Sequence, residues 1–400
     1  MTAYQPSLVQ PHRAFPRRIP LLMTLAVGVA FCAAGPAGAK SDALLSPRQQ
    51  SELTRLKAQA AGRDFDKALG AIEGIAKMGA PAREELRGLL GRLRQRNAFT
   101  IEACVRAAGA VEPFERATRE LRELRAKALA NIAKLKKDDG SIPLAETYSR
   151  ELRDRTRRLG PQLAARVRLL EAAGQRSCLL ALCRRYGPDG AKVGSATADP
   201  DPLVLAGQVL GTSLDGVRGW KELERRPELK DVTTYRFNRR AQRYNRRVLR
   251  SMHPEEARNV LAVNDYREAL GLLRLEADER LVQSARRHSK EMAELGYFSH
   301  QSPTKGLRSH GDRMKAAGYP GGGGENIALG RHRGLDVFGM WFRSPGHHRN
   351  MASGRYTALG VGKWGAYFTQ NFGSAPRLMD ATDAQRSAAK PKGDILPRGR

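Results

Sequence analysis

Apolar residues recur at three- and four-residue spacing over the first half of the chain, with arginine, glutamate and lysine between them. This is the period of an amphipathic helix. One apolar stripe consists of Phe114, Ala117, Leu121, Leu124, Ala128 and Leu135. A second stripe consists of Leu152, Leu159, Leu163, Val167 and Leu170. We therefore predict an all-helical bundle or hairpin over residues 40–185, with a break in the second helix at Gly160-Pro161.

Residues 186–255 are predicted to form a linker followed by one basic helix. From Gly187 to Asp215 the chain is rich in glycine, alanine, aspartate and proline, a composition typical of linkers. The segment Arg236–Arg250 then holds seven arginines and no acidic residue, and its apolar residues fall on one helical face. We favour a helix that packs this face on a neighbour and leaves the arginines in solvent. The alternative is that the arginines bind a polyanionic component of the cell envelope.

Residues 256–376 have a different pattern, in which glycines end short helices and most of the histidines occur. The segment Glu279–Leu295 predicts a helix with His288 on its apolar face. We interpret His288 as a hydrogen-bonded core histidine, and its i,i+3 spacing to Glu291 as incidental.

Two strands are predicted near the end of this region, at Tyr356–Lys363 and Ala366–Phe372, joined by a tight turn. Helices outnumber strands, so we expect a small sheet that is covered on both sides. Residues 377–400 lack periodicity and are predicted to be a disordered tail.

Residues 1–39 have the features of a secretory signal peptide. Arg17 and Arg18 precede a short apolar core, Leu21–Cys32, and Ala37-Gly38-Ala39 supplies a cleavage site. The core is shorter than the roughly 20 residues needed to span a bilayer. We therefore expect a secreted or cell-envelope protein, extracellular or periplasmic, with no transmembrane span in the mature chain.

The formal net charge is +29, and most of the excess lies before residue 256. Such a charge favours polyanionic partners. Nucleic acid is an unlikely partner for an exported chain. Three cysteines would remain after signal cleavage: Cys104, Cys178 and Cys183. Two arrangements stay open for them, a disulfide from Cys104 to one of the other two, or small buried hydrophobic side chains in helices.

Six short motifs follow one another in the C-terminal region: NDYREALG (264–271), YFSH (297–300), GGGGENIALG (321–330), WFRSPGHHRNM (341–351), ALGVG (358–362) and YFTQNFG (367–373). In this order they resemble the CAP superfamily of cysteine-rich secretory proteins, antigen 5 and plant pathogenesis-related proteins. The likeness is greatest to its bacterial, cysteine-poor secreted branch. It implies a CAP domain over residues 256–376, with an α-β-α sandwich and a surface cleft. The whole chain is then expected to be an α+β protein in which an all-helical region precedes the CAP fold.

The resemblance also implies a set of cleft residues. In the family two histidines and two acids line the cleft, and a divalent metal has been associated with it. Position by position, the histidines fall on His300 and His347 and the first acid on Glu325, whereas Ser344 stands at the second acid. His300, Glu325 and His347 could thus hold a divalent metal such as zinc, or form a hydrogen-bonded network that only fixes the loops. The neighbouring His348 is expected to be a surface or loop-bracing residue.

These features favour a non-catalytic extracellular binding module that holds a peptide, lipid or glycan in a His/Glu cleft. The alternative is a metal-assisted or serine-type hydrolase acting on peptide or cell-wall material, with His300 or His347 as general base and Glu325 as the orienting acid. Its candidate nucleophiles are Ser299, Ser302 and Ser344. The chain lacks a G-x-S-x-G motif, which disfavours the hydrolase. We interpret Gly321–Gly324 as a flexible approach that brings Glu325 to the cleft.

Overall fold

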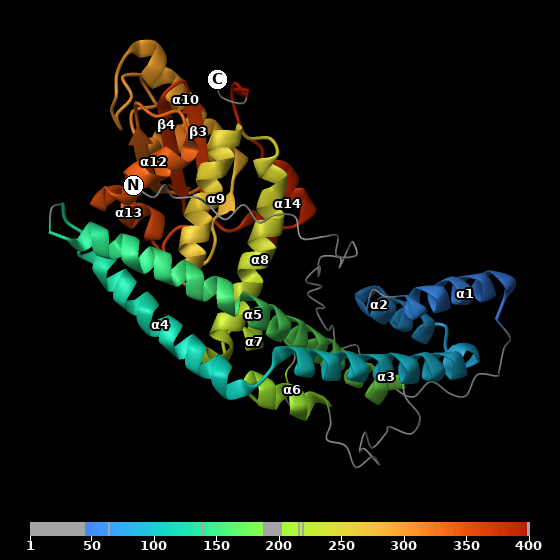
Figure 1. The fold of residues 1–400 in the computed structure, drawn as a ribbon. Coiled ribbons are helices and arrows are strands. Elements are labelled where there is room, and N and C mark those ends of the chain that lie inside the picture. The colour runs from blue at the N-terminus through green and yellow to red at the C-terminus, as the bar shows by residue number, and fades with distance from the viewer. Residues whose placement is uncertain are drawn as a thin grey trace. The chain divides into compact units, whose positions relative to one another are not determined.

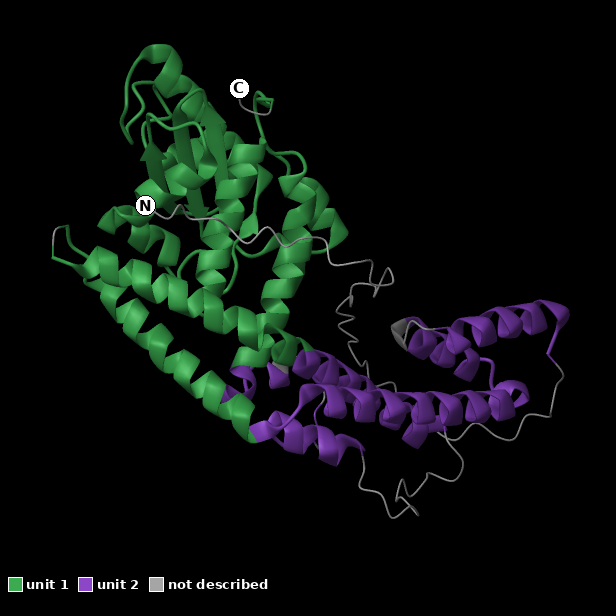
Figure 2. Cartoon of the chain, in the orientation of Figure 1, with its two compact units in different colours: residues 1–8, 112–164, 231–400 green, residues 9–111, 165–230 purple. Residues whose placement is uncertain are grey.

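The computed structural model describes residues 45–62, 65–137, 139–186, 202–214, 217 and 220–397 (Figure 1). The predicted signal peptide and residues 187–201 of the predicted linker lie outside the described residues. The chain divides into two compact units (Figure 2). Among the described residues, those within 112–164 and 231–397 belong to the first unit, and those within 45–111 and 165–230 belong to the second.

The second unit is helical throughout its described part. Its elements are α1 (Pro47–Ala61), α2 (Phe65–Ala76), η1 (Ala80–Ala82), α3 (Arg83–Ala108), α6 (Pro202–Leu210), α7 (Trp220–Leu223), η3 (Pro227–Leu229) and the later part of α5 (Ser141–Tyr186). Its core includes Ile72, Leu89 and Leu179. The all-helical prediction is confirmed. The predicted linker, however, contains helix α6, because its apolar residues Leu203 and Ala206 are buried.

The three cysteines of this unit are separate thiols. Cys183 packs, partly buried, against the core just described. Cys178 is exposed and Cys104 is half-buried. The structure has no disulfide among these three residues, and the alternative of buried side chains is wrong for Cys178.

Helix α5 continues through the proline at which the sequence predicted a break. It runs for 46 residues with Pro161 inside it. Leu159 and Leu163, on either side of the proline, are buried. Their packing favours a continuous helix at this point over the break that proline alone would cause. The predicted break is therefore wrong.

The first unit contains α4 (Val111–Ala133), the early part of α5 and the mixed region after residue 230. Its later helices are α8 (Lys230–Leu249), α9 (Pro254–Ala269), α10 (Glu279–Leu295), α11 (His310–Ala316), α12 (Gly334–Phe342), α13 (Pro345–Ala352), η4 (Leu378–Asp380) and α14 (Asp383–Ala388). Its strands are β1 (Glu276–Ala277), β2 (Gly323–Ala328), β3 (Ala358–Trp364) and β4 (Tyr367–Gly373). The C-terminal region is thus α+β, as predicted.

The four strands form one sheet in the order β1-β3-β4-β2, with β1 parallel to β3 and the other pairs antiparallel. Neighbouring residues of β4 show that helices cover both faces. Gln370 donates a hydrogen bond to Asn259 of α9, whereas the next residue, Asn371, donates one to Ser284 of α10. Successive side chains of a strand point to opposite faces, so α9 and α10 lie on opposite sides of the sheet (Figure 1).

Two glycines of β3 allow α10 to approach the sheet closely. A Cβ atom on Gly360 would lie 2.2 Å from the backbone of Leu281, and one on Gly362 would lie 2.1 Å from the backbone nitrogen of Arg286. No side chain fits in this space. The ALGVG motif therefore sets the distance between helix and sheet.

The basic helix α8 packs against the backbone that leads into β1. Asn245 donates to the carbonyl of Leu275 at 2.9 Å and accepts from the N–H of Ala277 at 2.9 Å. Asn238 accepts from the N–H of Arg274 at 2.8 Å. The helix is thus joined to the α+β region by paired amide contacts.

The arginines of α8 fall into two groups. Arg236 is buried, and Arg239 and Arg240 form ion pairs with Glu268 and Asp380. The exposed group comprises Arg243, Arg246, Arg247 and Arg250. The first group departs from the prediction that the arginines lie in solvent.

The tail differs from the predicted disorder up to Pro397. Residues 383–388 form α14, which begins with a capping box at Thr382. The backbone of Leu396 is hydrogen-bonded to Gln283 of α10. Side chains of α10 hold this segment in place, and no local pattern in the tail predicts that contact.

Candidate functional site

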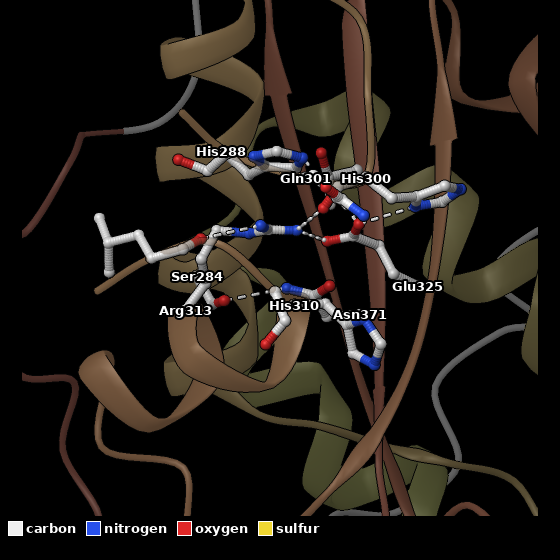
Figure 3. Close-up of polar contacts among 12 residues, drawn as sticks. Ser284, His288, His300, Gln301, His310, Arg313, Glu325 and Asn371 are labelled. Atoms are coloured by element: carbon white, nitrogen blue, oxygen red, sulfur yellow. Dashed lines mark hydrogen bonds and ion pairs between the residues drawn. The ribbon is translucent and has the colours of Figure 1, made fainter. Parts of the chain in front are cut away.

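Glu325 lies at the centre of a buried polar cluster, with 1% of its side chain exposed. Its Oε1 accepts a hydrogen bond from His300 Nδ1 at 2.9 Å, and its Oε2 accepts one from Arg313 at 2.7 Å (Figure 3). Glu325 belongs to β2, where it pairs in register with Asn371 of β4. The run Gly321–Gly324 is therefore not only the flexible approach that we predicted, because its second half is strand.

Glycine is needed in this strand for steric reasons. A Cβ atom on Gly323 would lie 1.6 Å from the carbonyl oxygen of Phe372, and one on Gly324 would lie 2.4 Å from the Tyr356 hydroxyl. The glycines let the strand pass close to its neighbours, and this passage positions the Glu325 carboxylate.

Arg313 is a member of the cluster that the sequence did not reveal. Its side chain is 3% exposed. Besides the Glu325 carboxylate, it donates to the carbonyls of Leu307, Arg308 and His300, each at 3.1 Å. It therefore holds the loop before α11 as well as the carboxylate. Arg313 lies outside all six motifs, so the sequence carried no signal for it.

His288 of α10 borders the same cluster and is buried, as predicted for a core histidine. Its Nε2 lies 3.0 Å from the carbonyl oxygen of Ser299 and 3.9 Å from Glu325 Oε1. Since a carbonyl only accepts, Nε2 carries the proton.

The i,i+3 spacing of His288 and Glu291, which we interpret as incidental, places the two side chains next to each other. Glu291 Oε2 lies 3.5 Å from His288 Nδ1. Glu291 also accepts hydrogen bonds from Tyr297 at 2.6 Å and Ser302 at 2.8 Å. One turn of helix places the two side chains on the same face, and together they hold the loop that carries His300.

The electrostatics keep Glu325 ionised. Burial alone would raise the pKa of Glu325, but the hydrogen bond from His300 and the charge of Arg313 outweigh it, so the pKa lies below its usual value. Burial lowers the pKa of His288, although the Glu325 charge opposes this shift. At neutral pH the cluster thus holds a carboxylate, a guanidinium and a neutral His288.

His347 and His348 occupy different environments on α13. His347 is half-buried, and burial followed by the charge of His300 lowers its pKa. His348 is fully buried. Its Nε2 lies 2.6 Å from the Tyr266 hydroxyl and its Nδ1 lies 2.6 Å from the Phe342 carbonyl oxygen. His348 therefore braces the interior, which corrects the surface location that we considered for it.

Two asparagines connect α13 to the strand of Glu325. Asn350 donates to Asn326 Oδ1 at 2.9 Å and to the Glu325 carbonyl at 3.3 Å. Asn326 donates to the His347 carbonyl at 3.2 Å. These contacts place His347 beside β2. Both asparagines lie within the motifs, but their pairing is visible only in the structure.

Comparison with known proteins identifies the region around this cluster. The family model described as "CAP: Cysteine-rich secretory protein family" matches residues 260–372. This region is a CAP domain. The resemblance seen in the six motifs is thereby confirmed.

Two curated proteins of Bacillus subtilis are similar to this part of the chain. "Uncharacterized protein YkwD" is 39% identical over 129 residues, which is 30% of this chain and 48% of that protein. "Uncharacterized membrane protein YlbC" is 38% identical over 108 residues, 26% of this chain and 29% of that protein. The matches span less than half the length of either relative.

Two solved structures are also similar over about the same share of the chain. An extracellular SCP-domain protein from Bacillus anthracis is 33% identical, with a TM-score of 0.30 over 30% of this chain and 41% of that one. An outer surface protein from Borrelia burgdorferi is 19% identical, with a TM-score of 0.27 over 29% of this chain and 90% of that one.

The side chains of the CAP domain do not fit the metal that the resemblance implied. A divalent ion on Oε2 of Glu325 would lie beside the buried Arg313 guanidinium, which already lies 2.7 Å from that oxygen. Ser344 supplies a hydroxyl in place of the second acid. In the described part of the chain, no group of three or more His, Cys, Asp or Glu side chains is placed to hold a metal.

Two of the three candidate nucleophiles, Ser302 and Ser299, form hydrogen bonds with other groups. Ser302 is buried and donates to Glu291 Oε1 at 2.8 Å. The Ser299 hydroxyl accepts from the N–H of Gln301 at 3.0 Å. Ser344 directly precedes α13 and makes no side-chain capping bond. Among the described residues, none of these three hydroxyls hydrogen-bonds a histidine ring, so the structure brings together His300 and Glu325 but no serine with them.

Proposed function

We propose that the CAP domain is a non-catalytic binding module, in which the exposed face of His300 contacts an anionic group of a peptide, lipid or glycan. The observation that carries the proposal is the pairing of Glu325. One of its oxygens accepts from His300 and the other from a buried guanidinium. A carboxylate held in this way is a poor base and a poor ligand, because a proton or a metal would have to displace a partner.

His300 is the member of the cluster that a ligand can reach, since 51% of its side chain is exposed. Because a carboxylate only accepts, Nδ1 donates to Glu325, and Nε2 remains for a ligand. Arg313 balances the charge of Glu325, so an anion that approaches His300 meets no net negative charge from this buried pair. His347 adds a second imidazole near His300, and burial, followed by the charge of His300, lowers the pKa of His347.

Binding can be tested with peptidoglycan sacculi, which carry free carboxylates, by co-sedimentation at low and high salt. We expect binding to weaken at least fivefold in His300→Ala. The matched control is His332→Ala, which removes an exposed histidine and should bind as the native protein does. Equal binding by both variants would refute a role for His300.

The hydrolase alternative predicts a different result in a panel of peptide and peptidoglycan substrates. We expect no turnover with or without added zinc, and no change in melting temperature with a chelator. Turnover that disappears in a folded His347→Ala variant would replace the binding proposal with the hydrolase. Turnover restored by zinc would show that a metal does bind.

We also propose a secreted or cell-envelope location, supported by the predicted signal peptide. No helix in the described residues has the length and apolar character to cross a bilayer. A polyanionic envelope partner remains a proposal for the exposed arginines of α8, which include Arg246 and Arg247. Charge reversal at both, Arg246→Glu with Arg247→Glu, should lower retention on a heparin column.

A further inference from the structure

The segment from Lys392 to Leu396 crosses α10 with a bend at Gly393. Three side chains of α10, Gln283, Arg286 and Arg287, contact it. These residues lie at i, i+3 and i+4, so they share one face of the helix. The face is thus a continuous polar surface along which a chain can lie.

All of these contacts reach backbone atoms of the segment. Gln283 donates to the Leu396 carbonyl at 3.1 Å and accepts from the Leu396 N–H at 2.9 Å. Arg287 donates to the carbonyls of Lys392 at 2.6 Å and Asp394 at 2.5 Å. The contacted residues 392, 394 and 396 alternate along the segment. The surface therefore recognises a peptide through its backbone.

One recognising group is fixed in advance by a contact outside the segment. Arg286 forms a two-bond ion pair with Glu256, at 3.0 and 2.6 Å. Because Arg286 is already ordered by this pair, a bound peptide loses little free energy to its ordering.

Two features select which peptide fits. Gly393 has a φ of +71°, and a Cβ atom there would lie 2.9 Å from the Arg287 guanidinium. Asp394 and Leu396 line a cavity of about 350 Å³, with Leu295 and Leu307 among its other walls. Ile395 is 59% exposed. The fit thus demands glycine at one position and favours an apolar residue three positions later.

We propose that this face of α10 is a peptide-binding site, and that residues 392–396 are its tethered ligand. The ligand class is a peptide that bends at a glycine and carries a leucine three residues later. His288 and Arg313 also line the cavity, so displacement of the segment opens a second side of the Glu325 cluster. This inference does not depend on the proposed function of His300.

The test uses the full chain with Gly393→Val, which should release the segment because valine is strained at this φ and meets Arg287. The probe is a fluorescent peptide of residues 391–397, PKGDILP. We expect this variant to bind the probe at least tenfold more tightly than the native chain, whose own segment competes at high effective concentration. The matched control is Gly140→Val. Gly140 also has a left-handed φ, +78°, but no atom lies within 4 Å of its Cβ position. This variant should bind the probe as the native chain does.

Adding Gln283→Ala to the Gly393→Val chain should weaken probe binding about tenfold, because two hydrogen bonds are lost. A probe with serine in place of Ile395 should bind unchanged, and one with valine in place of Gly393 should not bind. Absence of binding by a folded Gly393→Val chain, or equal binding with and without Gln283, would overturn the proposal.

Hydrogen exchange supplies a readout that needs no probe. In the native chain the Leu396 amide should exchange at least tenfold more slowly than in Gln283→Ala. Equal exchange would show that the segment is not held by α10, and would also overturn the proposal.

Discussion

Glu325 and Arg313 are buried together, with 1% and 3% of their side chains exposed. His300, on the other oxygen of the carboxylate, is 51% exposed. The two contacts are of similar length but differ in environment. Removing one partner of a buried pair leaves an unpaired charge in the interior, whereas an exposed ion pair contributes little.

We therefore expect Glu325→Gln to lower the free energy of unfolding by about 3–5 kcal/mol, and His300→Ala to lower it by less than about 1 kcal/mol. Urea unfolding at pH 7 measures both. The control is His332→Ala, which should be neutral. A Glu325→Gln variant as stable as His300→Ala would mean that Arg313 finds another partner or reaches water.

His348 gives the protein a defined acid sensitivity. Burial lowers its pKa to about 4, from a usual value of about 6.5. Between pH 4 and pH 6.5, His348 is protonated in the unfolded chain but neutral in the folded chain. Stability is therefore greatest above pH 6.5 and falls as the pH falls toward 4, by up to about 3 kcal/mol from this group.

The variant His348→Phe should lose much of this pH dependence, while keeping a ring among Tyr266 and Phe342. At pH 7 we expect it to be about 1–3 kcal/mol less stable, because the Phe342 carbonyl loses its donor. Urea midpoints measured from pH 4 to 7 compare it with His332→Phe, which should keep the native slope. If stability fell equally with pH in both variants, His348 would not be the cause of the acid sensitivity.

At the scale of elements, the distance between β3 and α10 determines the geometry of the CAP domain. The ALGVG motif contains two glycines, but the sequence does not show which part of the protein they contact. The structure shows that Gly360 and Gly362 face the backbone of α10.

Gly360→Ala should therefore destabilise the domain by about 3 kcal/mol, because a methyl group forces helix and sheet apart. Thermal unfolding of the full chain checks this value. Gly346→Ala is the matched control, since no atom lies within 4 Å of its Cβ position, and it should be neutral or slightly stabilising. A stable Gly360→Ala variant would mean that α10 can shift.

At the scale of the whole molecule, the α+β region extends beyond the family match. The match begins at residue 260, yet Asn238 and Asn245 of α8 hold the backbone that leads into β1. A domain boundary at residue 256, as predicted, would separate helix α8 from strand β1, which α8 supports.

A fragment of residues 228–400 should therefore be at least about 2 kcal/mol more stable to urea than one of residues 252–400, because removal of α8 exposes the backbone groups of residues 274–277. Both fragments lack the helical region, so the comparison isolates α8. A third fragment, residues 228–400 with Asn245→Ala, should lie between them. Equal stability of the first two would place the true boundary after α8.

Local patterns in the sequence determined the helical half, the hairpin of β3 and β4, and the six motifs that identify the CAP domain. Apolar periodicity, turn residues and motif order act over short distances along the chain, so they can be read directly. The motifs also located His300, Glu325 and His347.

Tertiary structure alone decided what those residues do. Arg313 and His288 meet the Glu325 carboxylate from α11 and α10, elements whose residues carry no shared pattern. The tail is ordered by Gln283 and Arg287, more than 100 residues earlier in the chain. A buried charge takes its partner from whatever the fold places beside it, and this choice depends on packing rather than on spacing along the chain.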